Sequence, residues 1–247
     1  MITKLRSITP AWIKKQPLIR ALRISMSENY QRLTAPVYRL MIPRSSYIDP
    51  TVHIIGWRQT KIGRNSVISQ GCWFNVNNRE SRYKTVQIGD NCFIGKNNFF
   101  SVGKSIIIRD YCLTAMGCNF LGSTHIYQDP FLPYITTGTT LKDEIYVGVN
   151  CSFGVNVLVI GNVRIGHGSI IGAGAVIRES IPPFSLAVGD PVKVIKRFNF
   201  IKKEWVVWSE EDGFDGPGEE EYLEILRKNV PQIRMPLVAA SRRKGDL

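Results

Sequence analysis

The amino-acid sequence predicts a mainly β protein whose centre is a parallel β-helix, a coil with three flat sides. Two periodic features predict this fold. The first is a large apolar residue at every sixth position: Val147, Phe153, Val159, Ile165, Ile171 and Ile177. The second is a small residue at the fifth position of each such hexad. Hexapeptide periods are typical of β-helices, in which about three hexads form one coil.

The fifth position is the stricter test of the repeat, because it has its own size limit. In eleven hexads the fifth residues are Ser66, Cys72, Cys92, Cys112, Cys118, Thr124, Cys151, Val157, Val163, Ser169 and Ala175. None is larger than valine, which suits a side chain packed beside a corner of a narrow prism. All five cysteines lie at this position and form no CxxC pair. We therefore expect reduced core cysteines and no zinc or disulfide role.

The repeat sets the expected extent of the prism. It runs from near Tyr47 to near Pro183, within a β-helix domain of residues 47–198. Two eight-residue steps, from Ile54 to Ile62 and from Phe100 to Ile108, predict small insertions at corners. The longer gap between Phe74 and Ile88 predicts a polar loop.

Residues 1–46 form a basic N-terminal extension. Apolar residues at helical spacing predict helices over about residues 10–40. Residues 1–50 contain nine Lys and Arg against two acidic residues, and the whole chain has a formal net charge of +12. This charge predicts an anionic partner, and nucleic acid is the least supported one because its usual motifs are absent. The helices either flank the prism or rest on an anionic membrane.

No apolar stretch approaches the roughly 18 residues that span a bilayer, and no signal-peptide core is recognisable. We therefore expect a cytoplasmic protein, with peripheral membrane contact as the open alternative. Residues 199–247 are predicted to be a tail with one short helix, in which Glu219–Glu221 come first, Arg227 and Lys228 come last, and Pro231 ends it.

The longest interruption of the repeat is the expected place for chemistry. The segment FLGSTH is predicted to close a hexad at His125, and the chain then leaves the prism until about Tyr146. An imidazole at the base of such a loop can accept a proton from a hydroxyl. His53 also ends a hexad but lacks the loop, and the side chain of His167 should point outward. Ligand spacings such as i, i+4 are absent among the histidines, which argues against a metal site.

Two stretches resemble a known family. Residues 171–197, IGAGAVIRESIPPFSLAVGDPVKVIKR, resemble the closing coil of the hexapeptide-repeat acyltransferases. His125, the loop and residues 147–176 together resemble the sugar and polysaccharide O-acetyltransferases of that family. The resemblance covers roughly residues 48–198. It implies a left-handed β-helix, acetyl-CoA as the donor without a metal, and a homotrimer with active sites between subunits.

The resemblance also implies roles for residues at matching motif positions. His125 would be the general base, and the Val155 amide would be a donor near the thioester. The residues expected to contact acetyl-CoA are Gly154, Val155, Gly172, Ala173, Arg178, Lys193 and Lys196. Small residues let a thin pantetheine chain approach the backbone, and cations suit its phosphates.

The acceptor side departs from the family pattern. Where many relatives have a tryptophan just before the apolar residue of a hexad, this chain has Ser152 before Phe153. We expect another aromatic to replace it: Phe153, Trp73, Tyr127, Phe131, Tyr134 or Tyr146. Tyr127, Asp129 and Phe153 are the predicted acceptor-binding residues, and Asp129 could also orient the imidazole of His125.

The leading functional hypothesis is an O-acetyltransferase that acts on a sugar hydroxyl, in a small molecule, an oligosaccharide, or a surface polysaccharide and its precursors. Two alternatives stay open. One is N-acetylation of an amino sugar nucleotide. The other is a non-catalytic β-helical protein that binds anionic glycan or membrane.

Overall fold

The computed structural model describes residues 38–40, 42–77, 83, 85–208, 215–230, 233 and 235. The chain divides into two compact units, Met1–Met41 and Ile42–Leu247. The predicted N-terminal helices lie almost wholly outside the described residues, as do residues 78–82 and 84 of the predicted polar loop before Ile88. The second unit contains every strand of the described ranges.

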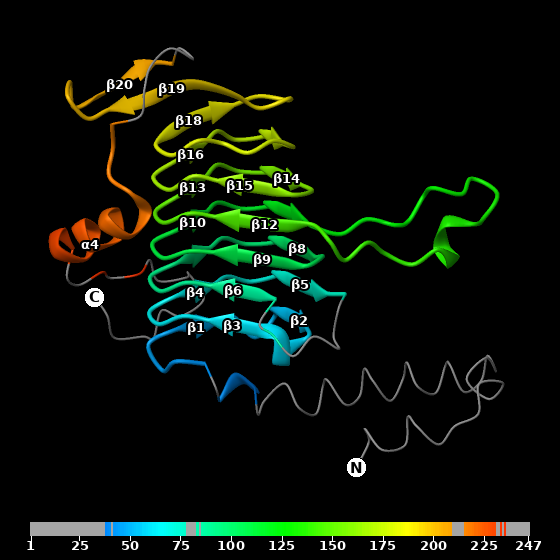
Figure 1. Ribbon diagram of the computed structural model, residues 1–247. Helices are drawn as coiled ribbons and strands as arrows, with labels where there is room; N and C mark the ends of the chain where they lie inside the picture. Colours follow the sequence, from blue (N-terminus) through cyan, green and yellow to red (C-terminus); the bar gives the residue numbers. More distant parts are fainter. Residues whose placement is uncertain are drawn as a thin grey trace. The chain divides into compact units, whose positions relative to one another are not determined.

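The second unit is a left-handed parallel β-helix with three faces (Figure 1). Face A contains β1 (Tyr47–Ile48), β4 (Val67–Ile68), β7 (Phe93–Ile94), β10 (Leu113–Thr114), β13 (Ser152–Phe153), β16 (Ile170–Ile171) and β18 (Ser185–Val188). Face B contains β2 (His53–Ile55), β5 (Trp73–Val76), β8 (Phe99–Val102), β11 (Asn119–Leu121), β14 (Leu158–Ile160) and β17 (Val176–Ile177). Face C contains β3 (Thr60–Ile62), β6 (Val86–Ile88), β9 (Ser105–Ile108), β12 (Glu144–Val147) and β15 (Val163–Ile165).

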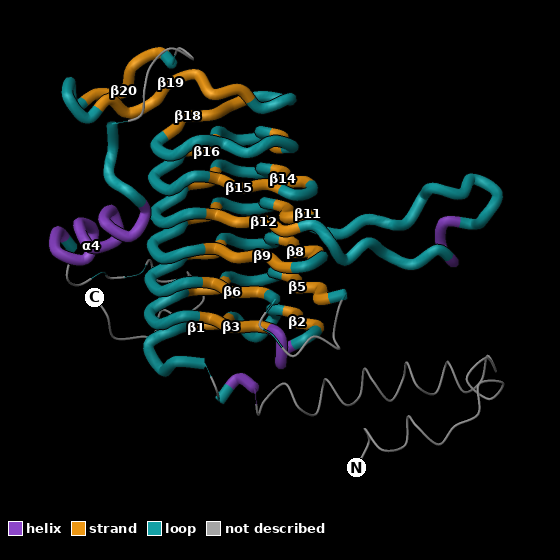
Figure 2. The backbone as a smooth tube through the Cα atoms, in the orientation of Figure 1, coloured by secondary structure: helices purple, strands orange, loops and turns teal. Residues whose placement is uncertain are grey.

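The chain passes from face A to B to C in every coil, so the repeat creates an A–B corner, a B–C corner and a C–A corner (Figure 2). A short 3-10 helix, η1 (Trp57–Gln59), occupies the eight-residue step that predicted a corner insertion. Strands of successive coils pair in parallel, and identical hexad positions therefore lie directly above one another.

The predicted core is confirmed. Phe74, Phe100 and Phe120 are fully buried on face B, and their rings stack in parallel with centroids 4.3 and 4.9 Å apart. The five cysteines are free and buried, as the fifth hexad position predicted. Volume alternation between large first and small fifth residues fills the prism.

The structure differs from the predicted repeat at two places. Strand β18 pairs in parallel with β16, so the coil continues past Pro183 to Val188. The hexad that begins at Phe120 is not completed, and Thr124 is exposed instead of packing in the core. The reason is that the chain after Leu121 pairs with the returning strand of the loop, near Thr140, rather than with another coil.

The C-terminal part closes the coil and returns along it. Strand β19 (Lys193–Asn199) pairs antiparallel with β18 and with β20 (Glu204–Val207). The expected domain boundary at residue 198 therefore falls within a continuous sheet. The predicted C-terminal helix is confirmed as α4 (Glu219–Asn229), with acidic residues in its first turn and basic residues in its last. None of the helices in the described ranges is both long and apolar enough to cross a membrane.

Candidate functional site

The three corners of the prism carry different structures, and this difference defines the candidate site. Residues 122–143 leave the B–C corner between β11 and β12 as a long loop, shown in green in Figure 1. Helix α4 lies against the C–A corner, where it contacts Val149 and Asn150. The A–B corner, which contains Val155, is formed by short turns alone.

The loop begins and ends as an antiparallel ribbon that holds His125. His125 forms a β-bridge with Thr139. On one side of it the Thr140 amide donates to the Thr124 carbonyl at 2.7 Å, and on the other the Ile126 amide donates to the Gly138 carbonyl at 3.1 Å. These bonds fix the backbone on both sides of the histidine, so the first residues of the exposed loop have a defined conformation.

The imidazole of His125 is exposed and has no hydrogen-bond partner within the part of the chain that the structure describes. It is therefore not at a prism corner, as the hexad count predicted, but on the ribbon that leaves that corner. The Asp129 carboxylate accepts a hydrogen bond from the Phe131 amide at 3.0 Å. It thus caps a turn of the loop, and the described contacts do not join it to His125.

The loop is rich in exposed apolar side chains. Phe131 is 93% exposed, and the other exposed members are Ile126, Tyr127, Leu132, Tyr134, Ile135 and Leu141. A short 3-10 helix, η2 (Tyr134–Thr136), shapes its far end. The predicted acceptor residue Tyr127 lies two positions beyond His125 on this surface.

Val155 occupies the third hexad position, whose amide has no acceptor in the parallel ladder. At the C–A corner, equivalent amides find carboxylate oxygens. The Arg64 amide donates to Asp90 at 2.7 Å, and the Asp90 amide donates to Asp110 at 3.0 Å. At the A–B corner the next third position is Ala173, whose side chain offers no acceptor. The Val155 amide therefore has no acceptor among the described residues.

The small residues of the A–B corner divide into two groups. A Cβ on Gly154 would lie 2.5 Å from the Ala173 nitrogen, and one on Gly172 would lie 2.7 Å from a Val188 methyl carbon. Packing between coils therefore explains these two glycines. Gly174 has φ +69° and open space where a Cβ would be. Ala173 and Gly174 are exposed, so the backbone here is accessible to a thin ligand.

Cationic side chains gather at the C-terminal end of the coil. Arg178 forms an exposed ion pair with Asp190 at 3.6 Å. Lys193 and Lys196 lie on β19, with Lys193 exposed and Lys196 half-buried. These residues follow the A–B corner in the chain and give this end of the prism positive charge.

Two residues named from the sequence are excluded from direct contact with an acceptor. The prediction for Phe153 is wrong, because its ring is 1% exposed and packs edge-on against Phe120 inside the prism. His167 points out of the prism as expected, but other residues cover it. Its Nε2 lies 3.0 Å from the Pro217 carbonyl oxygen, and its ring contacts Phe184 and Tyr222.

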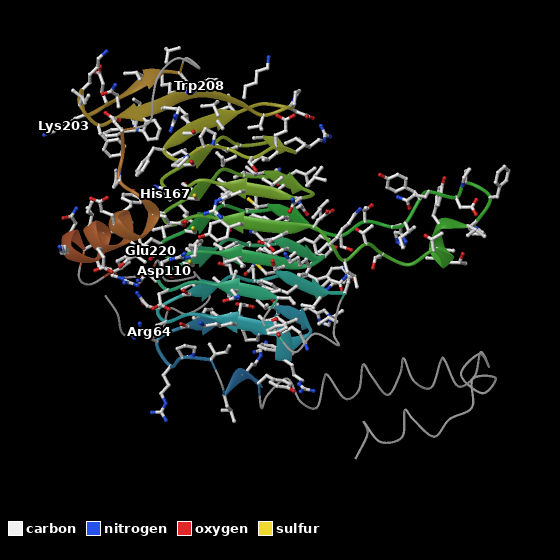
Figure 3. All side chains as sticks on the ribbon, in the orientation of Figure 1. Arg64, Asp110, His167, Lys203, Trp208 and Glu220 are labelled. Atoms are coloured by element: carbon white, nitrogen blue, oxygen red, sulfur yellow. The ribbon has the colours of Figure 1, made fainter. Side chains whose placement is uncertain are left out.

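The contacts of α4 with the C–A corner could not be read from the hexad pattern. Glu219 accepts hydrogen bonds from the Val149 amide at 3.0 Å and the Tyr146 hydroxyl at 2.9 Å. Glu219 thus supplies a carboxylate acceptor for the Val149 amide, which stands at the third hexad position and has no such acceptor from the coil itself. Arg164 lies 4.0 Å from the Tyr146 ring centre and pairs with Glu219 at 3.3 Å. Figure 3 shows Glu220 beside the same edge of the prism as Asp110 and His167.

Burial is the leading cause of the raised pKa of the Cys72 thiol and of the Tyr146 hydroxyl. Burial raises the pKa of the Cys72 thiol to about 12. Burial, and then the hydrogen bond to Glu219, raises the pKa of Tyr146. Among the described residues, His, Cys, Asp and Glu side chains form no cluster of three or more that could hold a metal ion.

Known proteins share the repeat and the fold. The family model "Hexapeptide repeat of succinyl-transferase" matches residues 85–118 and 144–179, on the two sides of the loop. A provisionally named acetyltransferase of Staphylococcus aureus (strain COL) is 37% identical over 114 residues, which are 46% of this chain and 56% of that protein. The chain thus spans little more than half the length of that relative.

A probable macrolide acetyltransferase of Lysinibacillus sphaericus is 30% identical over 154 residues, covering 53% of this chain and 82% of that protein. Among solved structures, a variant of AntD, an N-acyltransferase from Bacillus cereus in complex with dTDP and coenzyme A, superposes with a TM-score of 0.56. That match has 16% identity and covers 78% of this chain and 94% of the other. It supports the shared fold.

Proposed function

Because the chain belongs to the hexapeptide-repeat acyltransferase family, we propose that it is an acetyl-CoA-dependent O-acetyltransferase acting on a sugar hydroxyl. The acceptor would be part of a surface polysaccharide or its precursor. The observation that carries this proposal is the exposed imidazole of His125, held on a hydrogen-bonded ribbon at the base of a large loop.

In the proposed reaction, His125 takes the proton of the acceptor hydroxyl as its oxygen attacks the carbonyl carbon of the thioester. The Val155 amide donates a hydrogen bond to the oxyanion that forms on the thioester oxygen. Collapse of this intermediate breaks the carbon–sulfur bond, and the proton on His125 is available to the departing coenzyme A thiolate. No covalent enzyme intermediate is required.

The residues of the A–B corner fit the donor. Ala173 and Gly174 leave exposed backbone for the thin pantetheine arm, with open space beside Gly174. Arg178, Lys193 and Lys196 would meet the phosphates, since multiply charged anions favour cationic surfaces. Gly154 and Gly172 support this surface by allowing successive coils to approach closely.

One copy of the chain does not complete this site. His125 follows the B–C corner, Val155 lies at the A–B corner, and strand β11 of face B separates these corners. We propose that a neighbouring copy in a homotrimer brings its A–B corner to His125. This arrangement explains why a donor surface and a base lie on different corners of one prism.

The test is transfer of labelled acetyl from acetyl-CoA to a panel of sugars, nucleotide sugars and oligosaccharides, with hydroxyl and amino acceptors compared. His125→Ala should lower kcat by about 10²-fold or more, the usual scale for loss of a general base, while acetyl-CoA binding is retained. Arg64→Ala, an exposed substitution at the C–A corner, is the control and should keep normal turnover. Near-normal kcat in His125→Ala would reject the assignment.

The acceptor panel also decides between the alternatives. Transfer to amino sugars alone would favour N-acetylation, since an unprotonated amine depends less on a base. Binding of anionic glycan or liposomes without any transfer or hydrolysis of acetyl-CoA would favour the non-catalytic alternative.

A further inference from the structure

The A–B corner continues beyond the donor residues, away from the cationic end of the coil. The strands before this corner pair in register, and its third-position residues in successive coils are Gln70, Lys96, Met116, Val155 and Ala173. The carbonyls of the first four each accept a hydrogen bond from the fourth-position amide of the next coil, at 2.8–2.9 Å. The five residues therefore form one column along the corner, which we call the A–B column.

The C–A corner shows what a third-position amide binds in this molecule. The Arg64 amide donates to the Asp90 carboxylate at 2.7 Å, and the Asp90 amide donates to the Asp110 carboxylate at 3.0 Å. The Val149 amide donates to the Glu219 carboxylate at 3.0 Å. The next coil supplies the first two carboxylates, whereas α4 supplies the third. A carboxylate is thus the acceptor that suits this backbone position, whichever segment brings it.

Lys96 and Met116 have the same backbone position in the A–B column, but their amides have no acceptor among the described residues. The residues one coil further are Met116 and Val155, whose side chains contain no oxygen. The Lys96 ammonium likewise has no ion-pair partner in the part of the chain that the structure describes. Lys96 is half-buried and Met116 is 50% exposed. Two backbone donors and one cation therefore share a short stretch of this corner.

This stretch lies next to the reacting atoms of the proposed reaction. The donor would extend from the cationic end of the coil to Val155, and Met116 and Lys96 lie about 5 and 10 Å further along the corner. His125 follows β11, which belongs to the same coil as Met116. Rotation about a three-fold axis parallel to the coils keeps this level, so a neighbouring copy presents its His125 near Met116. Because the donor occupies the coils of Val155 and Ala173, the acceptor extends toward Lys96.

We infer that the acceptor is an acidic sugar, whose carboxylate accepts a hydrogen bond from the Met116 amide and pairs with the Lys96 ammonium. This inference rests on the proposed function for the positions of the donor and the base. The carboxylate site lies between copies, in the same groove as those groups. Charge-assisted hydrogen bonds are the strong ones, so they select acidic over neutral sugars. The net charge of +12 also favours the approach of an anionic acceptor.

The kinetic test compares Lys96→Gln with Lys61→Gln. Lys61 is an exposed residue of β3 on face C, so both variants lose one lysine charge. Acceptors are pairs that differ in the carboxylate: glucuronic acid and glucose, galacturonic acid and galactose, and a galacturonic acid dimer and its methyl ester. Lys96→Gln should raise KM for the acidic members about tenfold or more, with kcat and the neutral members unchanged. Lys61→Gln should change no value more than about twofold.

A binding measurement separates failure of this site from failure of the proposed reaction. Saturation-transfer NMR with the same sugars and no acetyl-CoA detects contact whether or not transfer occurs. Contact of the acidic sugars that is lost in Lys96→Gln but kept in Lys61→Gln supports the site even if no acetyl transfer is found. Equal contact in both variants, or no contact by any acidic sugar, overturns the inference.

Three further outcomes also overturn it. An equal rise of KM for acidic and neutral acceptors in Lys96→Gln would show that the lysine does not recognise the carboxylate. A change of molecular mass by light scattering in Lys96→Gln would make the lysine a contact between copies. If Lys96→Gln impairs transfer to neutral sugars from succinyl-CoA but not from acetyl-CoA, the carboxylate that Lys96 binds belongs to the acyl group of the donor.

Discussion

Glu219 joins helix α4 to the prism, and its removal gives the most direct test of how the C-terminal part is held. Its carboxylate is 14% exposed and accepts hydrogen bonds from the Val149 amide, the Tyr146 hydroxyl and the Arg164 guanidinium. Glu219→Ala removes all three at once. It leaves a part-buried amide and a part-buried hydroxyl without their acceptor.

The size of the effect follows from these contacts. A hydrogen bond to a charged group contributes about 1.5–3 kcal/mol, and the exposed Arg164 pair adds at most about 0.5 kcal/mol. Since the bonds share one carboxylate they do not add fully, and we expect a loss of about 3 kcal/mol. For a unit of this size that lowers Tm by roughly 6–12 °C. Glu219→Gln retains one acceptor oxygen and should lose about half as much.

Glu220→Ala is the matched control, because Glu220 is the next residue of the same helix. Its ion pair with Arg109 is at 2.8 Å, but its side chain is 73% exposed. Such pairs contribute about 0–1 kcal/mol, so Tm should fall by no more than about 4 °C. Differential scanning calorimetry of the full chain measures both variants. Equal Tm values for the two alanine variants would refute the argument that Glu219 completes the ladder of carboxylate acceptors.

The coil interior and its edge give three more testable expectations. Gly154→Ala should destabilise by about 1–3 kcal/mol in urea titrations, because its Cβ would meet the Ala173 nitrogen at 2.5 Å. At Gly218 a Cβ would meet no atom within 4 Å, so Gly218→Ala should cost only the roughly 0.5 kcal/mol of an alanine at the N-cap of α4, and a larger loss than in Gly154→Ala would contradict the packing argument. The five thiols, among them Cys72 with its pKa of about 12, should react with a thiol reagent at a pH of about 8 only after unfolding, so rapid labelling of native protein would disprove their burial. The raised pKa of Tyr146 favours its neutral form in the folded state, so this contribution to stability is complete below the ordinary tyrosine pKa of about 10 and is lost as pH rises through the folded-state pKa; a Tyr146→Phe variant should show a smaller alkaline loss in the same titration.

The hexad pattern was sufficient for the coil because the fold is nearly one-dimensional. Each hexad meets the equivalent hexads of adjacent coils, so a residue's position in the repeat determines whether it is core, corner or surface. The stacked phenylalanines, the buried cysteines and the continuation through Ile177 all follow from this local rule. The rule fails at Thr124, where the chain pairs with residues from the returning loop strand instead of a neighbouring coil.

The site depends on contacts between distant parts of the chain. The adjoining loop made His125 a candidate for the site, and the resemblance made Phe153 a candidate acceptor contact although it stands at the first, core position of its hexad. The fold places the Phe153 ring in the prism interior and the His125 imidazole on an exposed ribbon. The residue in the next coil also decides whether a third-position amide has an acceptor. The Asp110 carboxylate accepts a hydrogen bond from the Asp90 amide, whereas the Ala173 side chain has no acceptor for the Val155 amide.

By itself the sequence determined the coil, its core and the location of the loop, because these arise from period and side-chain volume. Only the tertiary structure decided which corner is covered by α4, which is extended by the loop, and which contains the Val155 amide that the described residues leave without an acceptor. The physical reason is that the three corners have almost the same local backbone. They become different only through segments far away in the chain, such as the helix at Glu219, which lies 70 residues beyond the amide it accepts from.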